Sequence, residues 1–253
     1  MIKNLFFAVL FVVISVSCSK EVPLQFASET ITESELEICK EVSCPEVTVS
    51  YVESVGDPVI SEKINSKIND FIISSLYIGD EETPPKAGTI SEAIAAFIKM
   101  YRTHSAEFPD MATEYFAEVT ITENYMSDDL ISLEMRNYLF TGGAHGYGST
   151  HFMNIDPKTG EEISTEALFK DLQGFTRFAE EKFREAHELA TNETINTSGF
   201  WFDNDTFTLP ETIGFTKETV ILLYNQYDIA SYASGPIELE ISREEAKPFL
   251  KVK

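Results

Sequence analysis

The sequence predicts an α+β fold in which helices pack on a mainly antiparallel sheet. Segments with helical and with strand periodicity follow one another in blocks along the chain. The strands are joined by turn-forming residues of the hairpin type rather than by regular helical crossovers. The 253 residues are enough for one hydrophobic core or for two small ones.

Each element is identified by apolar residues spaced by two in strands and by three or four in helices. The first half contains a strand over 47–52, a helix over 58–77, a helix beginning at Ile90 and a strand over 115–122. The second half contains strands over 130–140 and 149–155, a helix over 168–190, strands over 212–216, 218–224 and 236–241, and a short C-terminal helix. Asp57 and Pro58 supply an N-cap and a first-turn proline, and Thr89 and Glu92 form a capping box.

The N-terminus has the three parts of a secretory signal. Lys3 provides a positive charge, residues 5–14 form an apolar run too short to span a bilayer, and Ser17 precedes Cys18. We expect a signal peptide over 1–17, and an acyl anchor such as palmitate on Cys18. The protein would then be attached to a membrane of the cell envelope, at the periplasmic face of the outer membrane or at the cell surface. An uncleaved anchor, or a cysteine placed there by chance, is the alternative.

The residues after Cys18 are polar and lack clear periodicity, so 18–43 are expected to form the lipidated N-terminus and a tether. Cys39 and Cys44 lie five residues apart. In an exported chain this spacing suggests a disulfide. Metal binding is the alternative, and it is disfavoured because no second cysteine or histidine cluster lies nearby.

The chain is strongly acidic, with 19 Lys and Arg against 42 Asp and Glu and a formal net charge of −23. This charge argues against nucleic acid and anionic lipid head groups as partners. It favours a soluble, monomeric body that attracts cationic proteins or peptides over roughly the Debye length. Acidity that serves only solubility is the alternative.

A glycine-rich segment over 141–148 contains four glycines within seven residues. It lacks the Gly-Lys-Ser/Thr ending of a phosphate-binding loop and the Gly-x-Ser-x-Gly elbow of a serine hydrolase. Because glycine allows unusual backbone angles and close approach, we expect a binding or positioning loop. The alternative is a bulged connection between strands. The candidate binding residues are Thr141, Gly142, Gly143, His145 and Tyr147.

The histidines do not form a recognisable metal-binding set. His145 and His151 lack the H-x-x-x-H and H-E-x-x-H spacings, so we expect no metal site and no cofactor. A structural role, with hydrogen bonds to backbone carbonyls, is the preferred interpretation. His187 is expected to lie on the polar side of its helix and to be solvated.

Two aromatic segments are further candidates for binding. Trp201, between two phenylalanines and before acidic residues, is suited to stacking on a sugar or anchoring a protein partner. Tyr224, Tyr227 and Tyr232 belong to an irregular stretch and present aromatic faces with polar tips. Packing of the tryptophan loop on the sheet, and tyrosines bonded to the backbone, are the respective alternatives.

Residues 138–146 (YLFTGGAHG) and 223–238 (LYNQYDIASYASGPIE) together resemble a family of extracytoplasmic domains of unknown function. The family is shared by lysozyme-sensing anti-sigma factors, the non-catalytic parts of some polysaccharide deacetylases and many Bacteroidetes lipoproteins. The resemblance runs from about Cys44 to Ile241. It implies two linked α+β subdomains, 44–104 and 113–253, that are separated near 104–112.

The same resemblance implies a receptor-like domain, because in the anti-sigma members it resembles a receptor for lysozyme. No sigma-binding region and no deacetylase catalytic domain are recognised in this sequence. We therefore do not expect signalling by proteolysis or deacetylation to carry over.

These observations predict a non-enzymatic, envelope-anchored lipoprotein that binds a cationic protein such as lysozyme, or a cell-wall glycan. A hydrolase of envelope glycans or peptides, with His145 and nearby acids as catalysts, is the second hypothesis. A scaffolding lipoprotein is the third. Convergence of 141–148 and 224–236 on one open cleft would favour binding, whereas burial of both against the core would make them signatures of the fold.

Overall fold

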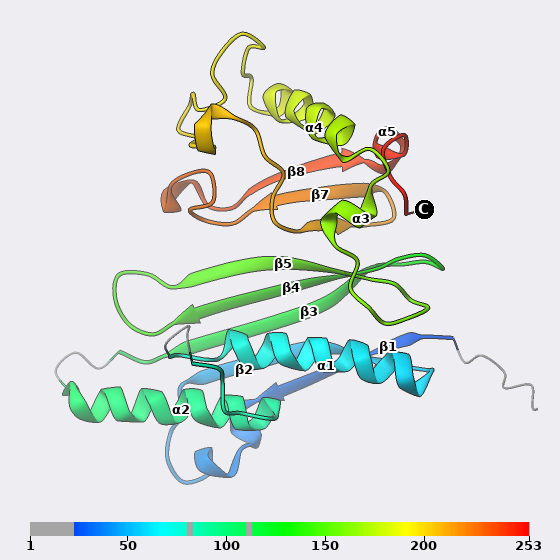
Figure 1. Ribbon diagram of the computed structural model, residues 1–253. Helices are drawn as coiled ribbons and strands as arrows, with labels where there is room; N and C mark the ends of the chain where they lie inside the picture. The colour runs from blue at the N-terminus through cyan, green and yellow to red at the C-terminus, as the bar shows by residue number, and fades with distance from the viewer. Residues whose placement is uncertain (1–22, 80–82, 110–112, 253) are drawn as a thin grey trace, which may run out of the picture.

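The computed structural model describes residues 23–79, 83–109 and 113–252, and Figure 1 shows their arrangement. The expected signal peptide and the expected lipidation at Cys18 lie outside these residues. Within the described ranges, no helix has both the length and the hydropathy that a membrane span requires.

The larger sheet has five strands in the order β1-β2-β3-β4-β5. These strands are β1 (Gln25–Thr32), β2 (Glu46–Val55), β3 (Phe116–Met126), β4 (Ile131–Phe140) and β5 (Tyr147–Ile155). Every neighbouring pair is antiparallel except β2 and β3, which are parallel. The mainly antiparallel α+β prediction is confirmed, but the connection from β2 to β3 is a helical crossover and not a hairpin.

The crossover consists of α1 (Pro58–Ser75) and α2 (Ile90–Glu107), which lie on one side of this sheet (Figure 1). The predicted N-caps are confirmed, since the Asp57 carboxylate accepts hydrogen bonds from the Val59 and Ile60 amides. Thr89 likewise accepts from the Glu92 amide. The apolar stripes of both helices are buried against β2 to β5; their least exposed members are Ile64, Ile68, Ile72, Ile94, Phe97 and Ile98.

A smaller sheet follows, with its strands in the order β6-β7-β8. Its elements are β6 (Ile213–Phe215), β7 (Thr219–Tyr224) and β8 (Ile237–Ser242), accompanied by α3 (Thr165–Leu168), α4 (Leu172–Ala186) and α5 (Arg243–Ala246). In Figure 1, α4 lies on the side of this sheet that faces away from the larger one. The expected helix over 168–190 is divided, because Asp171 caps a new helix through the Gly174 amide at 2.8 Å.

The chain forms two hydrophobic cores, and the boundary between them does not coincide with the expected linker. The first core combines β2 to β5 with both long helices. The second contains Leu130 and residues from 168 onwards. The change from one core to the other therefore occurs between β5 and α3, whereas α2 and β3, on either side of the expected linker, both belong to the first core.

The expected tether is wrong over Gln25–Thr32, because these residues form β1 and pair with β2 along their whole length. The strand lies at the edge of the sheet, and its apolar residues Phe26 and Ile31 are only partly buried. An edge strand of this kind does not need the strong alternation that identifies a strand with one fully buried face.

The disulfide prediction is confirmed: Cys39 and Cys44 are joined, with their Cα atoms 5.6 Å apart. Arg102 connects this loop to α2 by hydrogen bonds. Its guanidinium donates to the Ile38 carbonyl at 2.9 Å and to the Val42 carbonyl at 3.3 Å. The segment before β2 is thus part of the folded body.

Candidate functional site

The smaller sheet is attached to the open edge of β5 through side chains. The Thr150 amide donates to Asn225 Oδ1 at 2.7 Å, and Asn225 Nδ2 donates to the Thr150 carbonyl at 3.0 Å. The Phe152 amide donates to Thr212 Oγ1 at 3.0 Å. Since Asn225 directly follows β7, this attachment places the β7–β8 connection beside the β4–β5 connection, at the same end of the molecule (Figure 1).

The β4–β5 connection and the first two residues of β5, together residues 141–148, are called the glycine loop below. Gly142 and Gly143 have φ angles of +96° and +94°, which residues other than glycine adopt only with strain. Gly146 serves a different need, because a Cβ there would lie 2.3 Å from the Tyr138 hydroxyl and 2.8 Å from the Leu139 carbonyl. The glycines therefore provide unusual backbone angles in one half of the loop and close packing in the other.

The β7–β8 connection, residues 225–236, is called the tyrosine segment, and it contacts the glycine loop directly. The His145 and Tyr232 rings are stacked with their centroids 3.9 Å apart. The Tyr232 hydroxyl donates to the Gly146 carbonyl at 2.8 Å, and the Tyr227 ring lies 5.7 Å from that of Tyr232. We call His145, Tyr147, Tyr227 and Tyr232 the aromatic cluster.

The aromatic cluster is open to solvent and lies beside a carboxylate. Tyr147 is 46% exposed and Tyr227 is 52% exposed. Burial, and then the negative charge of Asp228, raise the pKa of the Tyr147 hydroxyl. The Asp228 carboxylate is therefore close enough to influence the ionisation of that hydroxyl. Aromatic faces beside a carboxylate can hold a cationic side chain, and the same faces can stack on a sugar.

Tyr227 has a φ of +74°, in the left-handed region that a bulky side chain adopts only with strain. A turn holds it there, because the Asn225 amide donates to the Asp228 carboxylate at 2.7 Å and the Asp228 amide donates to the Asn225 carbonyl at 3.1 Å. Strain of this kind collects at functional sites. The turn therefore holds the half-exposed Tyr227 in a backbone conformation that is strained for this residue.

Two of the predicted aromatic binding residues lie outside the cluster. Tyr224 is wrong as a binding residue, because it is only 2% exposed and its hydroxyl donates to the Thr208 carbonyl at 2.6 Å. Burial also raises the pKa of this hydroxyl strongly. Trp201 is 44% exposed, and its amide donates to the Ile229 carbonyl at 2.9 Å, so it lies next to the tyrosine segment.

The first residues of the glycine loop line a pocket, which we call the glycine-loop pocket. The residues of the aromatic cluster are not part of its lining. Its volume is about 310 Å³. The lining consists of His104, Ser105, Phe108, Thr113, Tyr115, Thr141, Gly142 and Gly143. The Tyr115 hydroxyl and His104 Nδ1 are 2.5 Å apart, which fixes both polar groups at the pocket wall. His104 and Phe108 fall in the linker expected over 104–112, and no sequence pattern indicated that they meet the glycine loop.

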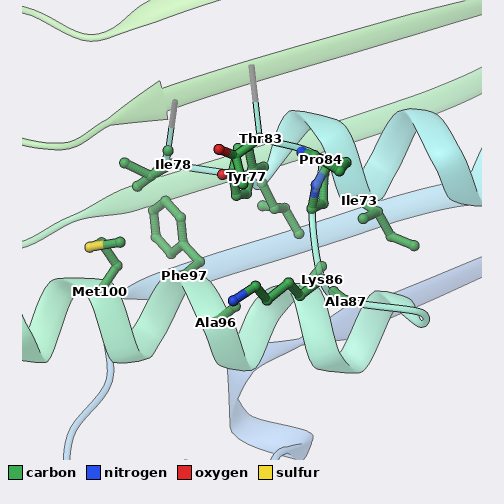
Figure 2. A pocket seen from close by; sticks show the side chains of 14 residues that line it. Ile73, Tyr77, Ile78, Thr83, Pro84, Lys86, Ala87, Ala96, Phe97 and Met100 are labelled. Carbon is green, nitrogen blue, oxygen red and sulfur yellow. The ribbon is translucent and has the colours of Figure 1, made fainter. Parts of the chain in front are cut away.

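A second pocket, of about 390 Å³, lies between the end of α1, the middle of α2 and residues 83–87. Figure 2 shows it with Phe97 and Met100 on α2, and with Ile73, Tyr77 and Ile78 from the end of α1 and beyond. Its lining is largely apolar, and none of the predicted binding residues belongs to it.

The remaining histidines have structural surroundings. His151 stacks on Phe71 of α1, with the ring centroids 6.4 Å apart. In the part of the chain that is described, no group of three or more His, Cys, Asp and Glu side chains is arranged to hold a metal ion.

The expectation that His187 is solvated is wrong. Its ring packs on Phe183 and Phe200, at centroid distances of 4.4 and 4.9 Å. Its Nε2 atom is buried and has no hydrogen-bond partner among the described atoms. Burial therefore lowers the pKa of this imidazole from its usual 6.5.

His187 should make the second core less stable in acid. Because its pKa is lower in the folded state, the unfolded state binds the extra proton first, and stability falls as the pH decreases through 6.5 towards the folded pKa. We expect wild type to lose unfolding free energy relative to the His187→Phe variant over this window. Denaturant titrations of both proteins at several pH values measure the difference. Parallel pH profiles would contradict the assignment.

Comparison with known proteins gives two matches to family models. Residues 38–147 match the model described as "Deacetylase PdaC", and residues 163–244 match the model described as "Protein of unknown function (DUF3298)". These matches confirm the resemblance inferred from the glycine loop and the tyrosine segment. No curated protein matched the chain.

Solved structures of two DUF3298 family proteins share the fold. A DUF3298 family member from Bacteroides fragilis superposes with a TM-score of 0.68 at 21% identity, over 91% of this chain and 94% of that one. A DUF3298 family protein from Pseudomonas aeruginosa gives a TM-score of 0.59 at 18% identity, over 92% of this chain and 95% of that one. The α+β architecture is therefore found in crystals of proteins that differ greatly in sequence.

Proposed function

We propose that this chain, which carries a PdaC-type region followed by a DUF3298 region, is an envelope-anchored, non-enzymatic binding protein for a cationic partner such as lysozyme. The observation that carries the proposal is the convergence of the glycine loop and the tyrosine segment on one exposed aromatic cluster. The two segments are far apart in sequence, yet the His145 and Tyr232 rings stack at 3.9 Å. The signal-like N-terminus ending at Cys18 supports the anchor.

Charge supports a cationic partner. The formal charge of −23 attracts a basic protein at a distance. At contact, Tyr147 and Tyr227 offer exposed faces beside Asp228, a setting that accepts an arginine or lysine side chain. Aromatic residues of this kind supply much of the binding energy at protein interfaces.

The geometry at His145 supports a binding role. Its ring is stacked on Tyr232, and its Nδ1 lies 3.1 Å from the carbonyl of its neighbour Gly146. Both features fix the ring as part of the aromatic surface.

Titration of the mature protein with lysozyme tests the proposal. We expect binding at about 0.01 M salt that weakens at about 0.15 M, because the Debye length falls from roughly 30 Å to roughly 8 Å. A neutral protein of similar size, titrated under the same conditions, is the control. Absence of binding at the low salt concentration, or binding of the neutral protein with equal strength, would contradict a cationic partner.

A further inference from the structure

The glycine-loop pocket differs in charge from the rest of the molecule. Asp, Glu, Lys and Arg make up 24% of the chain, yet none of the eight lining residues that the structure describes is one of them. On this described part of the lining a charged ligand would find no opposite charge. The lining therefore suits a neutral ligand, unlike the aromatic cluster, which lies beside Asp228.

The polar groups of this pocket are mostly hydroxyls. Ser105, Thr113, Tyr115 and Thr141 contribute one each, and His104 adds an imidazole. The 2.5 Å contact between the Tyr115 hydroxyl and His104 Nδ1 holds both groups in position before any ligand arrives. Fixed polar groups of this kind determine orientation and specificity in small-molecule sites.

The pocket also has an apolar wall and an open backbone edge. Phe108, at the end of α2, is 48% exposed, so its ring is available for stacking. A Cβ built on Gly142 or Gly143 would meet no atom within 4 Å. A ligand can therefore approach the loop backbone closely at these two residues.

We propose that the glycine-loop pocket binds one neutral pyranose ring of a glycan. A pyranose has an apolar face that stacks on an aromatic ring and an edge of hydroxyls that bonds to side-chain hydroxyls and imidazole. The volume of about 310 Å³ is near the lower end of the range for ligand sites, which suits one ring rather than a chain of sugars. The inference rests on the proposed binding role of this domain but not on its cationic partner.

The larger pocket in Figure 2 has a different character. Its lining is dominated by Phe97, Met100, Ile73 and Ile78, and no histidine lines it. A pyranose would leave most of its hydroxyls without partners on such walls. It therefore serves as an internal comparison for the glycine-loop pocket.

The test is an NMR titration of the full folded domain with the trimer of N-acetylglucosamine, with glycerol as a control for a non-specific polyol. We expect the trimer to shift backbone amide signals of residues 104–108 and 141–143, and glycerol to leave them unchanged. Thr141→Val removes one hydroxyl at nearly constant shape, and Phe108→Ala removes the stacking wall. Each should weaken binding by about fivefold or more, the effect of one lost hydrogen bond or aromatic contact.

Tyr227→Asn is the matched control, because Tyr227 belongs to the aromatic cluster and not to this pocket. It should leave the sugar affinity unchanged, while Phe108→Ala, which lies outside the glycine loop, should leave lysozyme binding unchanged. The two proposals can therefore fail separately. Signal changes confined to the pocket of Figure 2, equal shifts with glycerol, or unchanged affinity in both pocket variants would overturn the sugar site.

Discussion

Tyr227→Asn is expected to weaken binding of lysozyme by about 30-fold or more, the effect of losing an interface residue worth ~2 kcal/mol. Tyr227 is 52% exposed, against 46% for Tyr147, and it lies next to Asp228. Asparagine tolerates the left-handed backbone at φ +74° better than tyrosine does. The free energy of unfolding should therefore remain within ~0.5 kcal/mol of wild type or increase.

This combination separates a binding role from a structural one. A residue that only supports the fold would lose stability and affinity together. Calorimetric titration with lysozyme and a denaturant titration on the same preparation measure both quantities. Phe108→Ala is the control, because it removes an aromatic ring of similar exposure outside the cluster. Unchanged lysozyme affinity in Tyr227→Asn would remove Tyr227 from the binding surface.

Phe183→Ala should give the largest loss of stability, about 3–5 kcal/mol. Phe183 is fully buried on the inner face of α4. Its ring contacts five others, at centroid distances from 4.4 to 6.3 Å: His187, Phe200, Phe202, Phe207 and Tyr224. Truncation leaves a cavity where α4, the loop before β6 and the end of β7 meet.

The location of the loss matters as much as its size. Phe183 and its neighbour Tyr224 both belong to the second core. We therefore expect the second core to unfold earlier while the first core keeps its stability. Denaturant unfolding followed by amide hydrogen exchange resolves the two cores. Phe178→Ala, which removes a partly buried ring from the same helix, should cost less. A loss below ~1 kcal/mol in Phe183→Ala would contradict the packing described.

The sequence predicted the elements whose signals are local. The caps at Asp57 and Thr89, the helical stripes and the disulfide all depend on residues within a few positions of one another, and each is present. The edge strand β1 was missed because it is defined by pairing with β2, which lies across the disulfide loop. Its own residues lack a regular apolar alternation.

The site was predicted in its parts but not in its assembly. The glycine loop and the tyrosine segment were identified separately by composition. Their contact depends on the two hydrogen bonds between Thr150 and Asn225, which no local pattern encodes. Tyr224 was misassigned because it is the last residue of β7, where a one-residue difference separates the buried strand from the exposed loop. The contribution of α2 to the glycine-loop pocket is likewise a long-range contact.

Amide hydrogen exchange of the protein with and without lysozyme tests the central claim most directly. If the aromatic cluster is the binding surface, protection should increase together in peptides covering the glycine loop (141–148) and the tyrosine segment (225–236), with little change in α1. These two segments are joined by the stacked His145 and Tyr232 rings, so neither should respond alone. Protection elsewhere in the chain, or in only one of the two segments, would contradict the account.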